Sequence, residues 1–237
     1  MPLNISKCSA MSFTRSRDVS TFCYSLFNTP LSRPHSHKYL GLHFTSDLSW
    51  STHISHVISE ANKSLGYIRR NLKHAPPHLR HLAFTTLVRP KLEYASSIWD
   101  PYQDYLIKNL EGVQNRATRF ILSDYSFQTS VSALKNQVDL NDLVTRRRVS
   151  RLCLLHKLIT HPSIHSQHLS PALYISSRLD HPLKIKRPSC RSVSFSESFF
   201  PRTIREWNSL PGSIACIQDK AEFKTSLLQH VLPATSV

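Results

Sequence analysis

The sequence predicts an α+β protein, in which short antiparallel strands at the N-terminus precede a mainly helical remainder. Residues 1–50 contain short runs of strand-forming residues separated by polar, turn-like segments. From residue 52 onward, apolar residues instead recur every three or four positions, which is the period of an amphipathic helix. The change of period falls within Tyr39–Trp50, which we interpret as the junction between a small sheet and a helical domain.

The first fifty residues predict two or three strands. Ala10–Phe13 is short and apolar, whereas Thr21–Phe27 is rich in strand formers. Asn28–Pro30 is expected to break that second run. A sheet of three strands needs a covering layer. The helices downstream can cover one of its faces, and this sequence offers nothing to cover the other.

The junction itself carries strand and turn signals in close succession. Gly41 interrupts a run of strand formers, which indicates a bulge or a close approach of two backbones. Thr45–Asp47 is typical of a turn. Ser51 or Thr52 then provides a side chain that can cap the first helix.

Residues 52–73 give the clearest helical pattern of the chain, and Ala75–Pro77 ends it. A second helical run begins near Pro77. We expect Pro90 to kink or break this run, because proline cannot donate the backbone hydrogen bond that a helix interior requires. Its continuation ends at Asp100.

Asp100 and Pro101 suit the N-cap and the first position of a third helix, which runs to about residue 122. The polar connection after it contains one turn at Val131–Lys135. A fourth helix spans about 139–160. This fourth helix carries the densest basic cluster of the chain, Arg146, Arg147, Arg148 and Arg151.

The last third of the chain has a different character. Residues 161–198 are rich in Ser, Pro and His and show little periodicity, which indicates a loop or linker. Residues 199–237 form a C-terminal helical motif, with an aromatic helix-turn at Phe199–Asn208 and an amphipathic helix at 219–231. We therefore divide the chain at residues 50, 125, 160 and 198.

Composition restricts the function more than the fold. The 237 residues carry 30 Lys and Arg against 15 Asp and Glu, and this formal charge of +15 favours a polyanionic partner such as RNA or DNA. Only four glycines are present, and no phosphate-binding glycine motif occurs. Five cysteines without a CxxC spacing indicate a reducing, intracellular location, in the nucleus or the cytoplasm, over secretion. No apolar run is long enough for a bilayer.

Histidines and tryptophans offer further candidates, for which we expect structural roles. Cys153 and four histidines fall between residues 153 and 168, but their spacing fits no structural zinc motif, so we expect neither a metal site nor a cofactor. His53/His56 and His78/His81 are expected on helix surfaces. Trp50, Trp99 and Trp207 have apolar neighbours and are expected to be core anchors, although tryptophan can also stack on bases.

Several stretches resemble, in order, segments of the reverse transcriptases of LINE-type (non-LTR) retrotransposons. Asn4–Cys8 is similar to the NxxKC element that follows their catalytic aspartates, and Lys38–Ile54 to the segment that closes the palm before the thumb. Leu87–Pro101 resembles the thumb signature. Phe200–Pro211 resembles the C-terminal motif of chicken-repeat-type elements, which are common in arthropod genomes. The resemblance covers nearly the whole chain.

The resemblance implies a palm end at residues 1–50, a thumb-like helical domain at 51–125 and a basic helix region at 126–160. It places Tyr39, Leu40 and Gly41 at the primer grip. Lys63, Arg69, Arg70 and Lys73 would contact the nucleic-acid backbone along the thumb, with Arg146, Arg147, Arg148 and Arg151 as further candidates. For every one of these cations, a solvated helix face is the alternative.

The chemistry of a polymerase is missing from this sequence. Template-directed polymerisation needs carboxylates that hold two metal ions, and no adjacent pair of aspartates occurs. Asp139 and Asp142 are three residues apart, which suits helix capping better than metal binding. We therefore predict no enzyme activity and no small-molecule substrate. The expectation is a catalytically incomplete remnant that binds RNA or DNA without sequence preference. The alternatives are a host-adopted nucleic-acid-binding or protein-interaction module, and an enzyme whose catalytic half is a separate chain.

Overall fold

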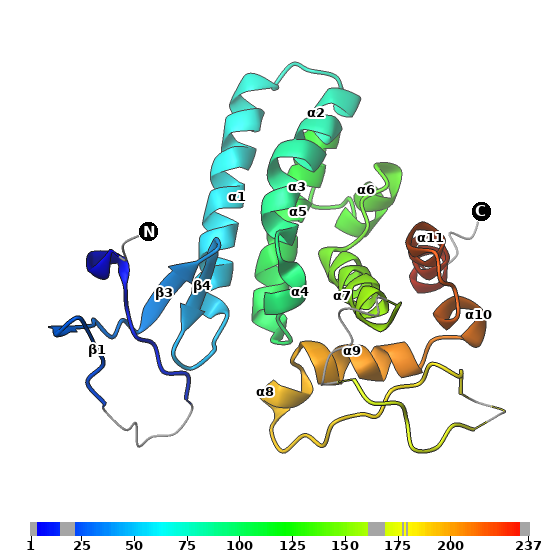
Figure 1. The fold of residues 1–237 in the computed structure, drawn as a ribbon. Coiled ribbons are helices and arrows are strands. Elements are labelled where there is room, and N and C mark those ends of the chain that lie inside the picture. The colour runs from blue at the N-terminus through cyan, green and yellow to red at the C-terminus, as the bar shows by residue number, and fades with distance from the viewer. Residues whose placement is uncertain (1–3, 15–21, 161–168, 177, 179, 233–237) are drawn as a thin grey trace.

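The computed structural model confirms the α+β class, with two small β-hairpins at one side of a helical body (Figure 1). It describes residues 4–14, 22–160, 169–176, 178 and 180–232. A short 3₁₀ helix, η1 (Ile5–Lys7), precedes the hairpins. Within the described ranges, no helix is both long and apolar enough to cross a bilayer.

The hairpins form two separate two-stranded sheets. β1 (Ser25–Leu26) pairs with β2 (Thr29–Pro30), and β3 (Ser36–Tyr39) pairs with β4 (Leu42–Thr45). Asn28–Pro30 was expected to end a strand. Instead the chain reverses at Phe27 and Asn28, both with positive φ, and re-enters a strand at Thr29. Within the described residues, neither hairpin pairs with a third strand.

The first helix, α1 (Ser51–Asn71), agrees with the predicted 52–73. The predicted cap is wrong, because neither Ser51 nor Thr52 caps the helix. The N-cap residue is Trp50, whose side chain makes no capping hydrogen bond. The turn is held one step earlier, where the Thr45 hydroxyl donates to Asp47 over 2.6 Å and to the Ser49 carbonyl over 2.8 Å. A bonded turn before the helix thus replaces the usual capping side chain.

Pro90 does not break the second helical run. α2 (Pro77–Ala83) continues through a five-residue π turn, η2 (Phe84–Val88), into α3 (Arg89–Glu93). The change of hydrogen-bonding register places Pro90 in the first turn of α3, where its missing N–H is not required. The chain breaks instead at Ala95, in the left-handed region at φ 51°, before α4 (Ser96–Trp99).

The third helix, α5 (Asp104–Leu122), starts later than predicted. Asp100 is therefore not its N-cap, and the N-cap position belongs to Gln103. The expected turn at 131–135 is α6 (Val131–Gln137). The fourth helix, α7 (Leu143–Thr160), also begins later than residue 139, because Asp139 adopts a positive φ of 50° that an α-helix cannot include.

The C-terminal part contains α8 (Val193–Ser196), α9 (Phe199–Asn208), α10 (Gly212–Ala215) and α11 (Lys220–Val231). The described residues between 169 and 192 form no helix, in agreement with the loop or linker predicted at 161–198, and α8 follows near the end of that range. This loop is packed against α9. Its Ile185 exchanges two hydrogen bonds with the Asn208 side chain, and its buried His181 pairs with the Trp207 carbonyl. Trp207 itself donates to the Leu183 carbonyl over 2.9 Å.

Two hydrophobic cores meet at α7. The first runs from Leu42 to Leu143 and joins β4 to α1, η2, α3, α4 and α5. The second joins α7 from Val149 onward to α9, α10 and α11. Trp99 in the first core and Trp207 in the second are fully buried, which confirms their predicted role. One helix thus contributes to both cores at opposite ends.

His53 is a further correction. It was expected on the surface of α1, but it is 2 % exposed and packs edge-on against Trp99, with ring centroids 5.3 Å apart. Its Nδ1 accepts a hydrogen bond from the backbone N–H of His43. Burial, together with the nearby His43 and His56, lowers the pKa of His53 to about 4. The ring is therefore neutral at pH 7.

Candidate nucleic-acid interface

The tip of the β3–β4 hairpin carries the three primer-grip candidates. Leu40 and Gly41 form a two-residue turn, with φ values of 47° and 83°. The Tyr94 hydroxyl donates to the Leu40 carbonyl over 3.1 Å, and the Tyr94 ring lies 3.3 Å from where a side chain on Gly41 would begin. Gly41 therefore lies at a close approach rather than in a bulge, while Tyr39 and Leu40 are exposed. Their contact with a primer stays a prediction.

Three of the thumb candidates, Lys63, Arg69 and Arg70, lie on α1, and Lys73 follows just after its last residue, Asn71. Arg69, Arg70 and Lys73 are exposed and make no ion pair within the described part of the chain. Lys63 is paired with Glu60 over 2.7 Å, although its side chain remains 70 % exposed. Because these positions face away from the buried stripe of α1, their charges are available to a partner in solution.

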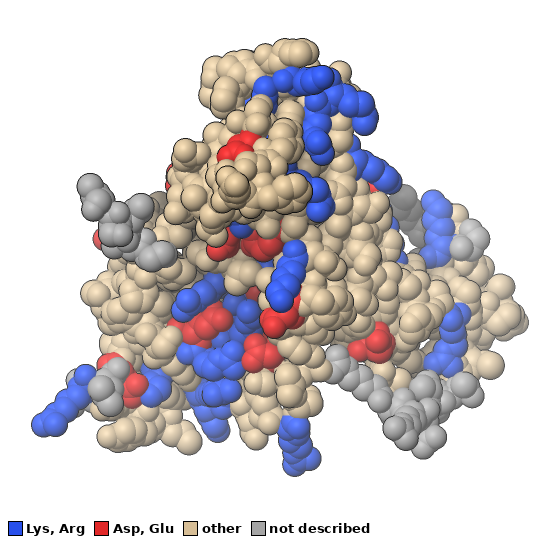
Figure 2. Space-filling model, turned by 180° about the vertical axis from the view of Figure 1, so that it is seen from behind, with Lys and Arg blue, Asp and Glu red and all other residues tan. Residues whose placement is uncertain are grey.

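α5 adds two cations that the sequence did not identify as a site. Lys108 and Arg116 are exposed on α5, and Arg116 donates to the Asn62 side chain of α1 over 2.8 Å. We define the basic face as Lys63, Arg69 and Arg70 of α1, Lys73 just after α1, and Lys108 and Arg116 of α5. Figure 2 shows basic side chains gathered at the top of the molecule, where α1 ends. Sequence periodicity assigns faces to each helix but does not tell which helices are neighbours.

Two arginines of this face lie beside glycines of their own helices. An Nη atom of Arg70 lies 3.5 Å from where a Cβ on Gly66 would be, and an Nη atom of Arg116 lies at the same distance from the Cβ position of Gly112. Each arginine thus lies back along its own helix over a residue without a side chain.

Two other arginines near this end have internal partners. Arg80 is 8 % exposed and donates to the Leu72 and Lys73 carbonyls at the end of α1. It also donates to the Phe120 carbonyl in the last turn of α5 over 2.9 Å. Arg119 holds the carbonyls of Ser126 and Thr129 in the following loop. Both side chains therefore stabilise helix ends and do not belong to the basic face.

The interpretation of Arg146, Arg147, Arg148 and Arg151 as phosphate-binding candidates is wrong for Arg147 and Arg151, which are buried. Arg147 and Arg151 are 1 % and 2 % exposed. The Asp100 carboxylate lies 2.6 Å from Nε of Arg147 and 2.9 Å from Nε of Arg151. Guanidinium groups buried in this way cannot reach a phosphate from solvent. Arg146 is paired with Glu93. The side chains of Arg146 and Arg148 are 30 % and 38 % exposed, and their contact with a phosphate stays a prediction.

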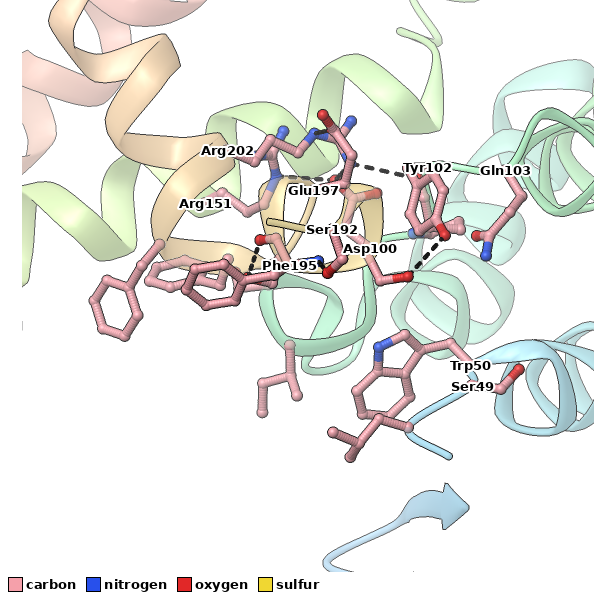
Figure 3. A pocket seen from close by; sticks show the side chains of 18 of the residues that line it. Ser49, Trp50, Asp100, Tyr102, Gln103, Arg151, Ser192, Phe195, Glu197 and Arg202 are labelled. Atoms are coloured by element: carbon pink, nitrogen blue, oxygen red, sulfur yellow. Dashed lines mark hydrogen bonds and ion pairs between the residues drawn. The ribbon is translucent and has the colours of Figure 1, made fainter. Parts of the chain in front are cut away.

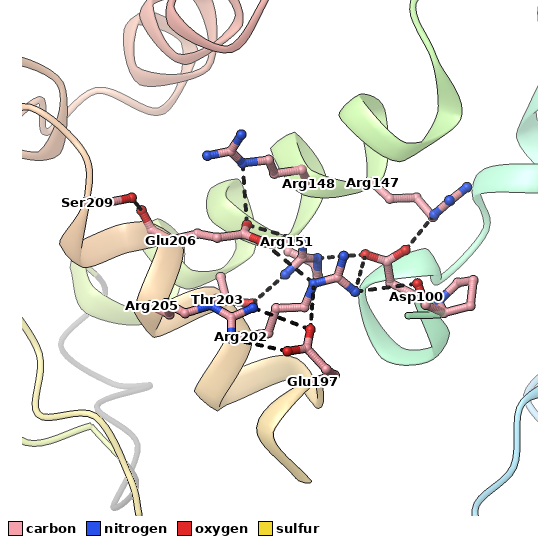
Figure 4. Close-up of polar contacts among 11 residues, drawn as sticks. Asp100, Arg147, Arg148, Arg151, Glu197, Arg202, Thr203, Arg205, Glu206 and Ser209 are labelled. Carbon is pink, nitrogen blue, oxygen red and sulfur yellow. Dashed lines mark hydrogen bonds and ion pairs between the residues drawn. The ribbon is translucent and has the colours of Figure 1, made fainter. Parts of the chain in front are cut away.

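The same ion pairs extend to α9 (Figure 4). Arg151 binds Glu206 over 3.1 Å, and Arg148 lies 3.6 Å from the same carboxylate. Arg202 contacts Asp100, Glu206 and Glu197, and the last of these also pairs with Arg205. Burial and the charge of Arg151 lower the pKa of Arg202, which nevertheless stays protonated at neutral pH. Five arginines therefore share three carboxylates and join α4, α7 and α9.

No catalytic constellation emerges from the described residues. Asp142 binds the ammonium group of Lys135 over 2.7 Å. Asp139, the other aspartate of the predicted pair, adopts a positive φ and lies outside α7. Among the residues that the structure describes, no three His, Cys, Asp or Glu side chains are placed to hold a metal ion. His156 stacks on Phe223 with centroids 4.1 Å apart, while three further histidines of the predicted cluster, at 161, 165 and 168, lie outside the described residues.

Comparison with protein-family models, with curated proteins and with solved structures finds no match to this chain. The likeness to LINE-type reverse transcriptases consequently rests on the sequence motifs alone. The basic face and the arginine–carboxylate network are the features on which a functional proposal can be built.

Proposed function

We propose that this chain binds nucleic acid through the basic face, and that it is a remnant of a LINE-type reverse transcriptase without a catalytic centre. The observation that carries the proposal is the separation of the cations into two groups. The arginines of α7 are occupied by carboxylates, whereas the six cations of the basic face lie exposed, and among them only Lys63 has a carboxylate partner within the described residues. An exposed cluster with such an excess of positive charge is what a phosphate backbone requires.

The chemistry of the face favours binding without sequence preference. Lysine and arginine neutralise phosphates, and contacts to phosphates fix position but carry no base information. We expect dissociation constants of roughly 10⁻⁴–10⁻⁶ M at physiological salt, with RNA and DNA both accepted.

The β3–β4 hairpin suits a role beside this face. Tyr39 is 61 % and Leu40 is 72 % exposed. The backbone carbonyl of Leu40 nevertheless accepts a hydrogen bond from the Tyr94 hydroxyl. A hydrogen-bonded turn that presents two large side chains to solvent suits contact with the end of a bound strand, which is the role that the resemblance implies. By the same resemblance, the chain lacks the aspartate pair, so we expect no primer extension with Mg²⁺ or Mn²⁺ above a no-protein control.

A protein-interaction module is the second candidate, and one observation favours it. The β1–β2 hairpin exposes aromatic side chains, with Phe22 at 63 % and Phe27 at 74 %. Exposed aromatic groups beside the edges of a small sheet are typical of a surface that pairs with another protein. This surface is separate from the basic face, so the two functions can be tested independently.

The test compares two variants that remove the same charge. The first replaces Arg69, Arg70 and Lys73 by Ala; the second replaces the exposed Lys157, Lys220 and Lys224 of α7 and α11. Binding of a labelled 20-bp DNA duplex is measured by fluorescence anisotropy between 50 and 200 mM salt. The first variant should lower the slope of log K against log salt by up to about 0.9 per lost contact. Equal slopes in both variants would contradict the proposal.

A further inference from the structure

A cavity of about 620 Å³ lies far from the basic face, where the turn before α1, the α4–α5 turn and the α8–α9 segment converge (Figure 3). This volume is typical of sites that hold a small organic group. Its walls come from four parts of the chain that are distant in sequence, because α7 also contributes Arg151 and Leu154. The Tyr102 hydroxyl and the Ser194 hydroxyl, 3.3 Å apart, join two of these parts across one wall.

The cavity is mainly aromatic and apolar. Trp50, Tyr102, Phe195, Phe199 and Phe200 are among its lining residues. Around the cavity, Ile98 is 52 %, Phe195 47 % and Leu48 45 % exposed. Apolar side chains gathered around a concave site favour binding of a planar, partly apolar group.

Two hydrogen-bonding groups at the cavity have no partner in the described part of the protein. One is the indole N–H of Trp50, whose nitrogen faces the interior in Figure 3. The other is the side-chain amide of Gln103, which does not cap α5 although it stands at the N-cap. An amide offers a donor and an acceptor in one plane, which matches the edge of a nucleobase.

A second, more open cavity of about 490 Å³ adjoins the first and shares Ser192 and Glu197 with it. Arg187 and Arg191 line this second cavity, and both are exposed and without an ion pair among the described residues. The Glu197 carboxylate between the cavities is already compensated by Arg202 and Arg205. Its charge therefore does not repel an anion at the two free arginines.

We propose that the paired cavities hold one unpaired nucleotide of a bound single strand. The base enters the aromatic cavity, stacks on an aromatic ring and meets the Gln103 amide, while the adjacent phosphate lies at Arg187 and Arg191. Because base and phosphate are recognised side by side, the ligand class is a nucleotide and not a simple anion or an apolar molecule. The proposal extends the proposed function to a second contact, at which single strands are distinguished from duplexes.

The first test uses tryptophan fluorescence. Trp99 and Trp207 are fully buried, so Trp50 is the tryptophan that a bound base can quench. Addition of a 12-nucleotide oligouridylate, and separately of uridine monophosphate, should quench the emission of the full chain. The quench should disappear in Trp50→Phe. If saturating oligouridylate leaves the emission unchanged, the cavity does not take a base. Quenching by the monophosphate alone would also reject the proposal of a strand.

The second test compares a fluorescein-labelled oligouridylate with a blunt RNA duplex of the same length. Gln103→Ala, and separately Arg187→Ala with Arg191→Ala, should weaken single-strand binding about tenfold. The control is Lys220→Ala with Lys224→Ala, which removes the same charge from α11. The Arg187→Ala, Arg191→Ala variant should lose no more duplex affinity than this control. Equal losses for both probes overturn this inference. Loss of duplex binding in the Arg69, Arg70 and Lys73 variant tests the basic face separately, so the two failures are distinguishable.

Discussion

Replacement of Asp100 by Asn should destabilise the protein more than any other single loss of a carboxylate. The Asp100 side chain is 5 % exposed and is the meeting point of Arg147, Arg151 and Arg202, the first two from α7 and the third from α9. An asparagine of the same shape fills the same space but carries no charge. The substitution therefore removes the compensation of three guanidinium groups without creating a cavity.

The magnitude follows from burial. Arg147 has no other carboxylate partner within the described residues, and its two Nη atoms already lack hydrogen-bond partners. Arg151 and Arg202 keep Glu206, so the main cost comes from Arg147. Loss of one partner of a buried ion pair costs about 3–5 kcal/mol, because the remaining charge stays buried. In a double mutant with Arg147→Met, part of this loss should return, since the uncompensated charge is then absent.

The assay is urea unfolding followed by tryptophan fluorescence. Asp139→Asn is the matched control, because Asp139 is exposed and its positive φ of 50° suits asparagine equally well. The control should change the free energy of unfolding by no more than about 0.5 kcal/mol. A loss below 1 kcal/mol in Asp100→Asn, or no recovery with Arg147→Met, would refute the view that these ion pairs hold α4 and α7 together.

Three further predictions concern other parts of the molecule. Arg80→Ala should lower the free energy of unfolding by about 3 kcal/mol, because buried carbonyls at the ends of α1 and α5 lose a charged donor; urea unfolding measures this. Between pH 7 and pH 5, stability should fall by about 2 kcal/mol. The reason is that unfolded His53 takes up a proton near pH 6.5 and folded His53 does so only near 4; a flatter pH profile in His53→Phe checks it. Amides of β1 and β2 should exchange with deuterium faster than those of residues 54–68, since each hairpin lacks strand neighbours; the reverse order would contradict this.

Local patterns predicted the helices well. The apolar spacing between residues 52 and 73 depends only on the period of one helix, and α1 appears within two residues of that range. Details that depend on distant residues were wrong. Pro90 is accommodated by a π turn, and nothing in its immediate sequence specifies that turn. The segment around Ile185 resembles a linker in composition, although it packs against α9 through Asn208.

The candidate site was only partly predictable for the same reason. Arg69, Arg70 and Lys73 were identified because an amphipathic pattern tells which residues face away from the core. Arg116 was missed as a site residue, since its contact with Asn62 joins positions 54 residues apart. The cavity beside Trp50 could not be foreseen, because its walls come from four separate regions of the chain.

The four arginines of α7 show why the density of basic residues in a sequence does not measure a binding surface. Carboxylates from positions 93, 100 and 206 meet them, and each of these lies about fifty residues away in the chain. A net charge of +15 therefore distributes unevenly, with acidic groups used for the interior and cations left at the surface. The ion pairs of Arg147 and Arg151 lie where the two hydrophobic cores of the protein meet. Mutation of either arginine should therefore reduce binding only by unfolding the protein. Variants of α1 should reduce binding with the fold intact, and circular dichroism recorded beside each binding curve separates these outcomes.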